Sequence, residues 1–224
     1  MDQPRMSGRD RNAHHEPVGS KTKAAPGALV GLVGLAAVVL VALGGLIWWE
    51  TGPARGPPEP APSAIGGPFA MTDQTGRRVD QHILDGHWTA VFFGYTYCPD
   101  VCPATLQALS AAAGKLGPGA RDFQVVFVTV DPDRDTPKQM KSYIDAEDLK
   151  VPTLGLTGSA TDVATIAKAY KVYYAKSGSG ENYTMDHSAA VYLMDSKGRF
   201  VSPLSHEMAP DKIAGEILKA QGKA

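Results

Sequence analysis

The sequence is poor in cysteine and has no excess of charge of either sign. Its 224 residues include only two cysteines, Cys98 and Cys102, and 22 lysines and arginines stand against 23 aspartates and glutamates. Since a structural zinc site needs four ligands, two thiols cannot form one by themselves. The balanced charge gives no indication of nucleic-acid binding. The length suits one globular domain with additional segments, and two domains would also fit.

Charge is missing altogether from one long stretch near the N-terminus. Residues 27–49 read GALVGLVGLAAVVLVALGGLIWW, which is 23 residues without a charged side chain. A helix of this length reaches across the hydrocarbon core of a bilayer, which is about 30 Å thick. Trp48 and Trp49 stand where an aromatic belt is usual, and the run is longer than the apolar part of a cleaved signal peptide. The stretch predicts an uncleaved transmembrane helix.

Basic residues are concentrated on one side of this stretch. Only Arg55 follows it closely, whereas five precede it: Arg5, Arg9, Arg11, Lys21 and Lys23. By the positive-inside rule, residues 1–26 are a cytoplasmic tail and everything after the helix lies outside. Acidic residues in the tail argue against a mitochondrial transit peptide. We therefore expect a single-pass protein of a bacterial inner membrane with a periplasmic C-terminal domain. That compartment is oxidising, so unprotected thiols tend to pair there.

The rest of the chain divides by composition into a linker and a domain. Residues 50–68 are rich in proline and glycine, which predicts a semi-rigid spacer. Residues 69–224 are enough to bury a core. Their first segment, 69–80, predicts two short strands around a Gln-Thr-Gly turn.

Apolar runs and periodic segments alternate along this domain. β-rich apolar runs predict buried strands at 88–96, 123–130 and 189–195. Helical patterns occur at 103–117 and 137–148, both with capping signals, and at 161–171 and 210–220. This alternation predicts an α/β layer fold whose sheet is at least partly parallel.

Both cysteines stand in FFGYTYCPDVCPATL, residues 92–106, between a predicted strand and a predicted helix. Pro103 suits the first helical position, so we expect Cys102 near the helix N-terminus. There the helix dipole and the unpaired N–H groups favour thiolate, which is both the nucleophile and the metal ligand.

Three interpretations of the pair remain open. A structural disulfide closing so short a loop would stabilise the fold little. A redox pair is usually C-x-x-C, and here the spacing is one residue longer. Two thiolates suit Cu(I), and a histidine as third ligand would give a trigonal site for Cu(I) or Cu(II).

His187 is the histidine best placed to join the thiols. It stands in ENYTMDHSAAVYLMD, after a Gly/Ser-rich insert, at the entrance of what we expect to be the last buried strand. The alternative is a histidine that caps a strand end. His82, His87 and His206 fall in predicted turns or loops, and His14 and His15 precede the predicted membrane span.

The stretch VTVDPDRDTP, residues 128–137, leads from a predicted strand into a predicted helix. Thr136 suits the N-cap, Pro137 suits the first helical position, and Gln139 would complete a capping box. The aspartates of the stretch have two interpretations, turn and cap chemistry, which we favour, or an acidic rim near a metal. They are Asp131, Asp133 and Asp135.

Four motifs together resemble one family, the Sco/SenC proteins. They are MTDQTGRRV, GYTYCPDVCPATL, VTVDPDRDTP and the Asp186–His187 pair that opens a strand, and they cover nearly all of the predicted domain in order. The resemblance implies a thioredoxin-like fold with a single membrane anchor. It also implies a copper ion, Cu(I) or Cu(II), held by Cys98, Cys102 and His187.

The resemblance further implies a metallochaperone rather than an enzyme. Its partner would be the copper-site subunit of cytochrome c oxidase. A periplasmic copper donor or a thiol reductant would be a further partner. The alternative function is a thiol–disulfide oxidoreductase that uses Cys98 and Cys102 to reduce the cysteines of that oxidase site. A thiol peroxidase would need an activating arginine, and none lies near the motif in the sequence.

Overall fold

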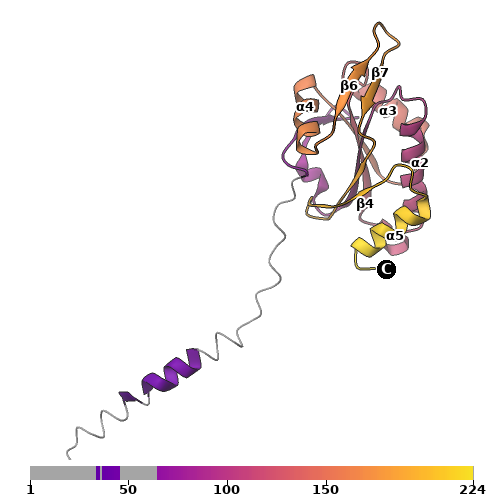
Figure 1. Cartoon of the computed structure of the whole chain (residues 1–224). Helices are drawn as coiled ribbons and strands as arrows, with labels where there is room; N and C mark the ends of the chain where they lie inside the picture. Colours follow the sequence, from indigo (N-terminus) through magenta and orange to yellow (C-terminus); the bar gives the residue numbers. More distant parts are fainter. Residues whose placement is uncertain (1–33, 36, 46–64, 224) are drawn as a thin grey trace, which may run out of the picture. The chain divides into compact units, whose positions relative to one another are not determined.

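The computed structural model describes residues 34–35, 37–45 and 65–223 (Figure 1). The first two ranges are helical. About half of the predicted membrane span, 27–49, lies outside the described residues, as do the whole predicted tail, 1–26, and most of the predicted linker, 50–68. Within the part of the chain that the structure describes, no helix is both long and apolar enough to cross a membrane.

Residues 65–223 alternate strands with helices. The strands are β1 (Ala70–Asp73), β2 (Arg78–Asp80), β3 (Trp88–Gly94), β4 (Phe123–Thr129), β5 (Thr153–Thr157), β6 (Tyr174–Ser177), β7 (Thr184–His187), β8 (Val191–Met194) and β9 (Phe200–Leu204). The α-helices are α2 (Val101–Ala113), α3 (Pro137–Ala146), α4 (Ala160–Ala169) and α5 (Pro210–Ala220), and the 3-10 helices are η1 (Gln81–Leu84) and η2 (Gly117–Ala120).

Seven strands form one mixed sheet in the order β2-β1-β5-β4-β3-β8-β9. The central strands β3, β4 and β5 run parallel, and the others pair antiparallel. This arrangement confirms the predicted α/β fold with a partly parallel sheet. The strands β6 and β7 form a separate two-stranded hairpin.

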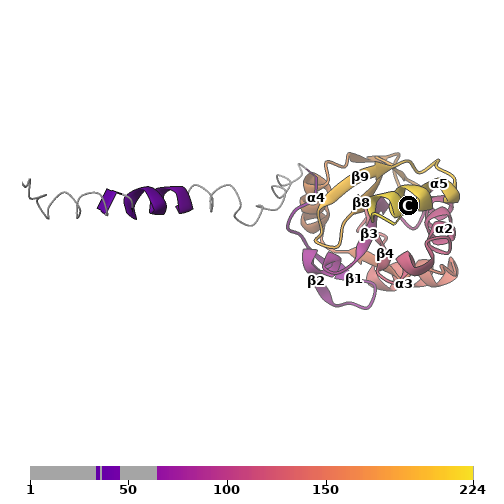
Figure 2. The same ribbon diagram turned by 90° about the horizontal axis from the view of Figure 1, so that it is seen from below.

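Helices cover both faces of the sheet, which explains the continuous apolar runs. On one face Phe92 and Phe127 pack under α2 and α5, and on the other Phe93 and Val128 pack against α4. Figures 1 and 2 show α4 on one side of the sheet and α2 and α5 on the other. Since successive strand side chains point to opposite faces, a strand covered on both must be apolar throughout.

One expectation about the C-terminal part was wrong. The run at 189–195 contains the buried strand β8, as predicted, and a half-exposed strand, β9, follows it at the sheet edge. Pro203 in β9 is typical of an edge strand and weakens its strand pattern. His187 does not open β8, since it ends β7 of the separate hairpin, whose four-residue strands are half-buried or exposed.

Candidate metal centre

The cysteine loop connects the carboxyl end of β3 to the N-terminus of α2. As predicted, Cys102 lies at the helix N-terminus, but the helix begins at Val101 and Pro103 is therefore not its first residue. Proline is tolerated there because the first N–H groups of a helix have no intrahelical partner. Cys98 precedes the helix, and the two cysteines are not joined by a disulfide.

The two sulfurs lie in different environments. Cys102 is fully buried, whereas Cys98 is half-buried at the surface. The Cys98 sulfur accepts a hydrogen bond from the backbone N–H of Cys102, at 3.4 Å, and so satisfies one of the unpaired donors of the helix.

A hydrogen bond between the two cysteine side chains shifts their pKa values in opposite directions. A hydrogen bond from the Cys102 thiol, with further ones from the backbone N–H groups of Asp100 and Cys102, lowers the pKa of Cys98 to about 5. The same thiol hydrogen bond, together with burial, raises the pKa of Cys102. At neutral pH the pair therefore holds one thiolate, on Cys98, and one thiol beneath it.

Gly94, the last residue of β3, makes room for the buried sulfur. A Cβ at this position would lie 2.6 Å from the Cys102 sulfur and 2.9 Å from the Phe127 ring. The sequence analysis did not identify this residue, although a glycine that ends an apolar strand is a signal of close approach.

His187 reaches the pair from the hairpin. Its Nε2 lies 4.0 Å from the Cys102 sulfur, and its Nδ1 lies 3.0 Å from the carbonyl oxygen of Ser188. A carbonyl oxygen only accepts, so Nδ1 carries the proton and Nε2 presents its lone pair towards the sulfur. The edge of the ring meets Tyr95 at a centroid distance of 5.9 Å.

The spacing of these atoms suits one metal ion between them. A first-row metal such as zinc lies about 2.3 Å from a thiolate sulfur and about 2.0 Å from an imidazole nitrogen, so it can bridge a gap of up to about 4.3 Å. Among the described residues, however, no three histidine, cysteine or acidic side chains are already arranged as a metal site. The ligands would have to close around the ion.

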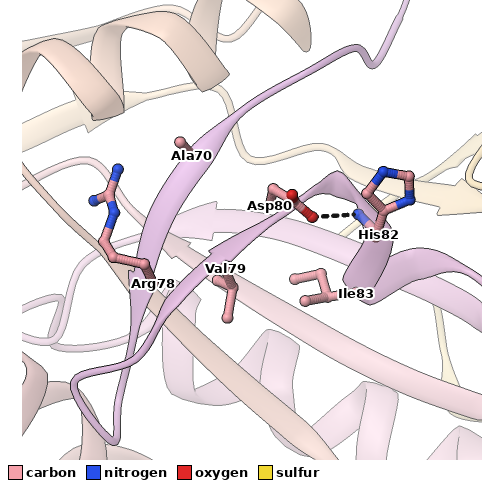
Figure 3. Close-up of a pocket in the computed structure, with 6 residues that line it drawn as sticks. All are labelled: Ala70, Arg78, Val79, Asp80, His82 and Ile83. Carbon is pink, nitrogen blue, oxygen red and sulfur yellow. Dashed lines mark hydrogen bonds between the residues drawn. The ribbon is translucent and has the colours of Figure 1, made fainter.

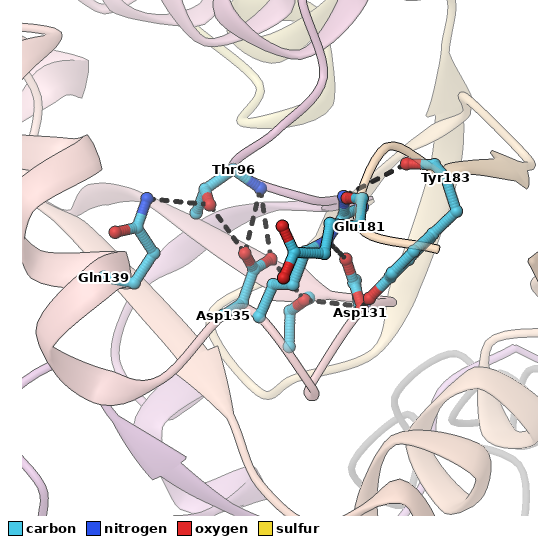
Figure 4. A network of polar contacts seen from close by, with 8 residues as sticks. Thr96, Asp131, Asp135, Gln139, Glu181 and Tyr183 are labelled. Carbon is cyan, nitrogen blue, oxygen red and sulfur yellow. Dashed lines mark hydrogen bonds and ion pairs between the residues drawn. The ribbon is translucent and has the colours of Figure 1, made fainter. Parts of the chain in front are cut away.

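Two of the three aspartates of the 128–137 stretch, Asp131 and Asp135, belong to a network of polar contacts, shown in Figure 4. Asp131 and Asp135 are buried, which contradicts the alternative of an acidic rim for these two, and Asp133 is exposed. Asp135 accepts hydrogen bonds from Thr96 and from the Thr129 hydroxyl.

The predicted cap of α3 forms in part. The Thr136 hydroxyl accepts from the backbone N–H of Gln139, and Pro137 is the first helical residue. The capping box is not completed, because the Gln139 side chain donates to the Thr96 hydroxyl in the cysteine loop instead.

A separate hollow of about 500 Å³ lies beside β1, β2 and η1 (Figure 3). It contains none of the predicted site residues. Its charged side chains have partners, since Arg78 pairs with Asp162 and His82 with Asp85.

The comparison with protein families agrees with this geometry. Residues 57–221 match the family model described as SCO1/SenC. The chain belongs to this family. Its relatives include Protein SCO1 homolog 1, mitochondrial, of Arabidopsis thaliana, which is 37% identical over 164 residues, 72% of this chain and 48% of the relative. The matched part thus spans about half of that SCO1/SenC protein.

Solved structures of SCO1/SenC proteins share the fold. Bradyrhizobium japonicum ScoI, solved with copper bound, is 41% identical, and the match covers 70% of this chain and 99% of that one with a TM-score of 0.63. BsSco, described as having a disulfide switch and as a member of the Sco family of cytochrome c oxidase assembly proteins, is 26% identical. That match covers 71% of this chain and 95% of BsSco with a TM-score of 0.58. The predicted thioredoxin-like fold is therefore confirmed.

Proposed function

We propose that the protein is a copper-binding assembly factor that loads the copper site of cytochrome c oxidase. The observation that carries this proposal is the approach of His187 Nε2 to the Cys102 sulfur, in a family with a copper-bound member. Cys98, Cys102 and His187 would bind one Cu(I) or Cu(II) ion.

The three residues divide the work of holding the ion. With two thiolates and a neutral imidazole, the site is neutral with Cu(II) and carries one negative charge with Cu(I). Thiolates favour Cu(I), and the imidazole nitrogen makes Cu(II) acceptable. Binding displaces protons, so acid weakens loading. Cys98, at the surface, is the ligand that a docked oxidase subunit or a copper donor can reach first.

Copper titration of the reduced protein tests the ligand set. The parent should bind one copper tightly, with thiolate-to-Cu(II) charge-transfer absorption. Cys98→Ser and Cys102→Ser should lose tight binding, and His187→Ala should bind Cu(II) far more weakly. Stoichiometric copper in either serine variant would refute the assignment.

The alternative is a thiol–disulfide exchange that reduces the cysteines of the oxidase site. It is favoured by the low pKa of Cys98 above the buried Cys102 thiol and by the disulfide switch of BsSco. The Cys98 thiolate would attack the partner's disulfide and release one partner thiolate. Cys102 would then give its proton to the released partner thiolate and attack the Cys98 sulfur, releasing the second partner thiolate and leaving a Cys98–Cys102 disulfide. This reaction does not need His187, so His187→Ala separates the two functions.

We place this activity outside a bacterial inner membrane, with residues 27–49 as the anchor and 50–68 as the spacer. The uncharged run and the basic residues before it support this location. Protease added to spheroplasts should digest residues 69–224 and spare an epitope within 1–26. Digestion of the N-terminal epitope instead would reverse the orientation.

A further inference from the structure

The β6–β7 hairpin that carries His187 has few bonds to the rest of the fold. It shares no strand pairing with the seven-stranded sheet. A two-stranded hairpin by itself is marginally stable in water. The position of His187, its last strand residue, therefore depends on side-chain contacts that hold the hairpin in place.

Arg134 makes a large share of these contacts. Its guanidinium carbon lies 3.6 Å from the ring centroid of Tyr183, and one of its terminal nitrogens donates to the carbonyl oxygens of Tyr183, at 3.0 Å, and Glu181, at 3.4 Å. On another side it lies 4.5 Å from the ring centroid of Tyr97, the neighbour of Cys98. One side chain thus bridges the hairpin to the cysteine loop.

Asp131 closes this bridge into a ring of contacts. Its carboxylate accepts from Arg134 Nε through one oxygen and from the Tyr183 hydroxyl, at 2.7 Å, through the other. Both partners are well shielded, with side chains 15% and 3% exposed for Arg134 and Asp131. A shielded charge pair with several hydrogen bonds constrains geometry far more than a surface pair does.

The buried Nη2 of Arg134 supports a role beyond charge pairing. This atom has no hydrogen-bond partner among the residues in the structure. An arginine placed only for stability would not need to bury an unpaired N–H group, which costs free energy. In place of a hydrogen bond from this atom, the guanidinium makes cation–π contacts with the rings of Tyr97 and Tyr183.

We propose that Arg134 is a positioning residue for His187, which clamps the hairpin against the cysteine loop. It thereby determines whether a metal ion is held by two sulfurs alone or by two sulfurs and the imidazole nitrogen. This inference rests on the proposed copper site. Tyr95 also helps to position His187, since its ring contacts the imidazole and its hydroxyl group forms a hydrogen bond with the backbone of Met185.

Arg134→Met removes the charge and the donors but keeps the apolar length of the side chain. In the full-length protein, Cu(II) affinity should fall by about 10- to 100-fold, the range typical of groups that orient a metal ligand. The charge-transfer band should move towards that of His187→Ala. Cu(I) affinity, which two thiolates supply, should stay within about threefold of the parent. Tyr183→Phe, which removes only the hydroxyl bond to Asp131, should weaken Cu(II) binding in the same direction by less.

Three comparisons test whether Arg134 acts through His187. In a His187→Ala background, Arg134→Met should have no further effect on Cu(II) binding. Arg199→Met, which removes a similar arginine–aspartate pair with Asp195 at the other end of β8, should leave copper binding unchanged. Without metal, backbone amides of β6 and β7 should exchange hydrogen faster in Arg134→Met than in Arg199→Met, while those of β3 and β4 should not.

The proposal would be overturned if Arg134→Met lowered Cu(II) affinity as much in the His187→Ala background as in the parent. Equal losses of Cu(I) and Cu(II) affinity would overturn it too, and either result would indicate a general structural role. Parent-like binding and exchange in Arg134→Met would overturn it as well. If His187→Ala itself binds Cu(II) as the parent does, His187 is not a ligand and the proposed copper site fails. The hydrogen-exchange comparison still tests the clamp, because faster exchange in β6 and β7 of Arg134→Met would show that Arg134 holds the hairpin, and parent-like exchange would show that it does not.

Discussion

Gly94 and the Cys102 sulfur occupy adjoining space at the end of β3. Gly94→Ala should force the sulfur or the Phe127 ring aside, because the new Cβ would lie under 3 Å from both. Overpacking of this kind costs about 1–3 kcal/mol, and displacement of the sulfur should weaken copper binding as well. Urea unfolding and copper titration measure the two effects.

Gly114→Ala is the matched control for Gly94→Ala. Gly114 directly follows α2 and has helical dihedral angles, and the nearest atom to an added Cβ there would lie at an ordinary 3.5 Å. An alanine there should be neutral or stabilise by about 0.4–1 kcal/mol. Equal behaviour of the two variants would show that the space beside Gly94 is not limiting.

The low pKa of Cys98 has a direct chemical consequence. Since Cys98 is a thiolate above about pH 5, its alkylation by iodoacetamide in the reduced, metal-free protein should hardly change between about pH 6 and 8. An ordinary cysteine, with a pKa of about 8.5, would react markedly faster at the higher pH. Peptide mass spectrometry should find Cys98 modified first and the buried Cys102 protected.

Cys102→Ala tests the cause of this shift. It removes the thiol that donates to Cys98, so the pKa of Cys98 should rise and its alkylation at pH 6 should slow. An unchanged rate in this variant would assign the low pKa to the helix N-terminus alone.

At the scale of elements, Asp135 joins the carboxyl ends of three parallel strands. Its carboxylate binds Thr96, just beyond β3, and Thr129 at the end of β4, while its backbone carbonyl accepts from Thr157 at the end of β5. Asp135→Ala would leave buried donors of Thr96 and Thr129 without partners, at about 1–3 kcal/mol each. We expect a loss of about 3 kcal/mol or more in the free energy of unfolding, measured with urea.

Asp133→Ala provides the comparison, since Asp133 is an exposed residue of the same loop. Its effect should stay within about 0.5 kcal/mol. Similar losses for both variants would mean that the loop sequence, and not the Asp135 network, sets the stability of this end of the sheet.

For the whole molecule, the buried Asp73 and the partly buried Asp195 predict sensitivity to acid. Burial alone would raise their pKa values, but hydrogen bonds outweigh it: from Thr75 and Arg77 for Asp73, and from Arg199 and Lys197 for Asp195. Both pKa values lie below the ordinary value. The folded state therefore gains stability above the unfolded pKa, about 3.9, and loses it as the pH falls through the lower folded values.

Urea midpoints between about pH 6 and 2.5 check this prediction. The parent should lose stability steeply below about pH 4. Asp195→Asn should be less stable at neutral pH and should show a shallower decline in acid. A decline identical to that of the parent would exclude Asp195 as a contributor.

Much of the fold follows from local sequence patterns. The runs around β3, β4 and β8 are apolar throughout because helices cover both faces of the central sheet, and capping residues such as Thr136 mark where a helix begins. Those signals depend on nearest neighbours along the chain. The strands β6 and β7 give a weaker signal, because each has only four residues, its side chains are half-buried or exposed, and it pairs only with the other.

The sequence by itself determined that Cys98 and Cys102 stand between a buried strand and a helix N-terminus, where thiolate is favoured. Only the tertiary structure decided which thiol holds the proton, because burial and the hydrogen bond between the sulfurs depend on how α2 packs on β3. The same is true of His187, which comes within 4.0 Å of a sulfur 85 positions earlier in the chain. That approach rests on contacts of Asp131 and Arg134 with Tyr183, which lies 52 and 49 positions further along the chain, and contacts of this kind leave no periodic trace in the sequence.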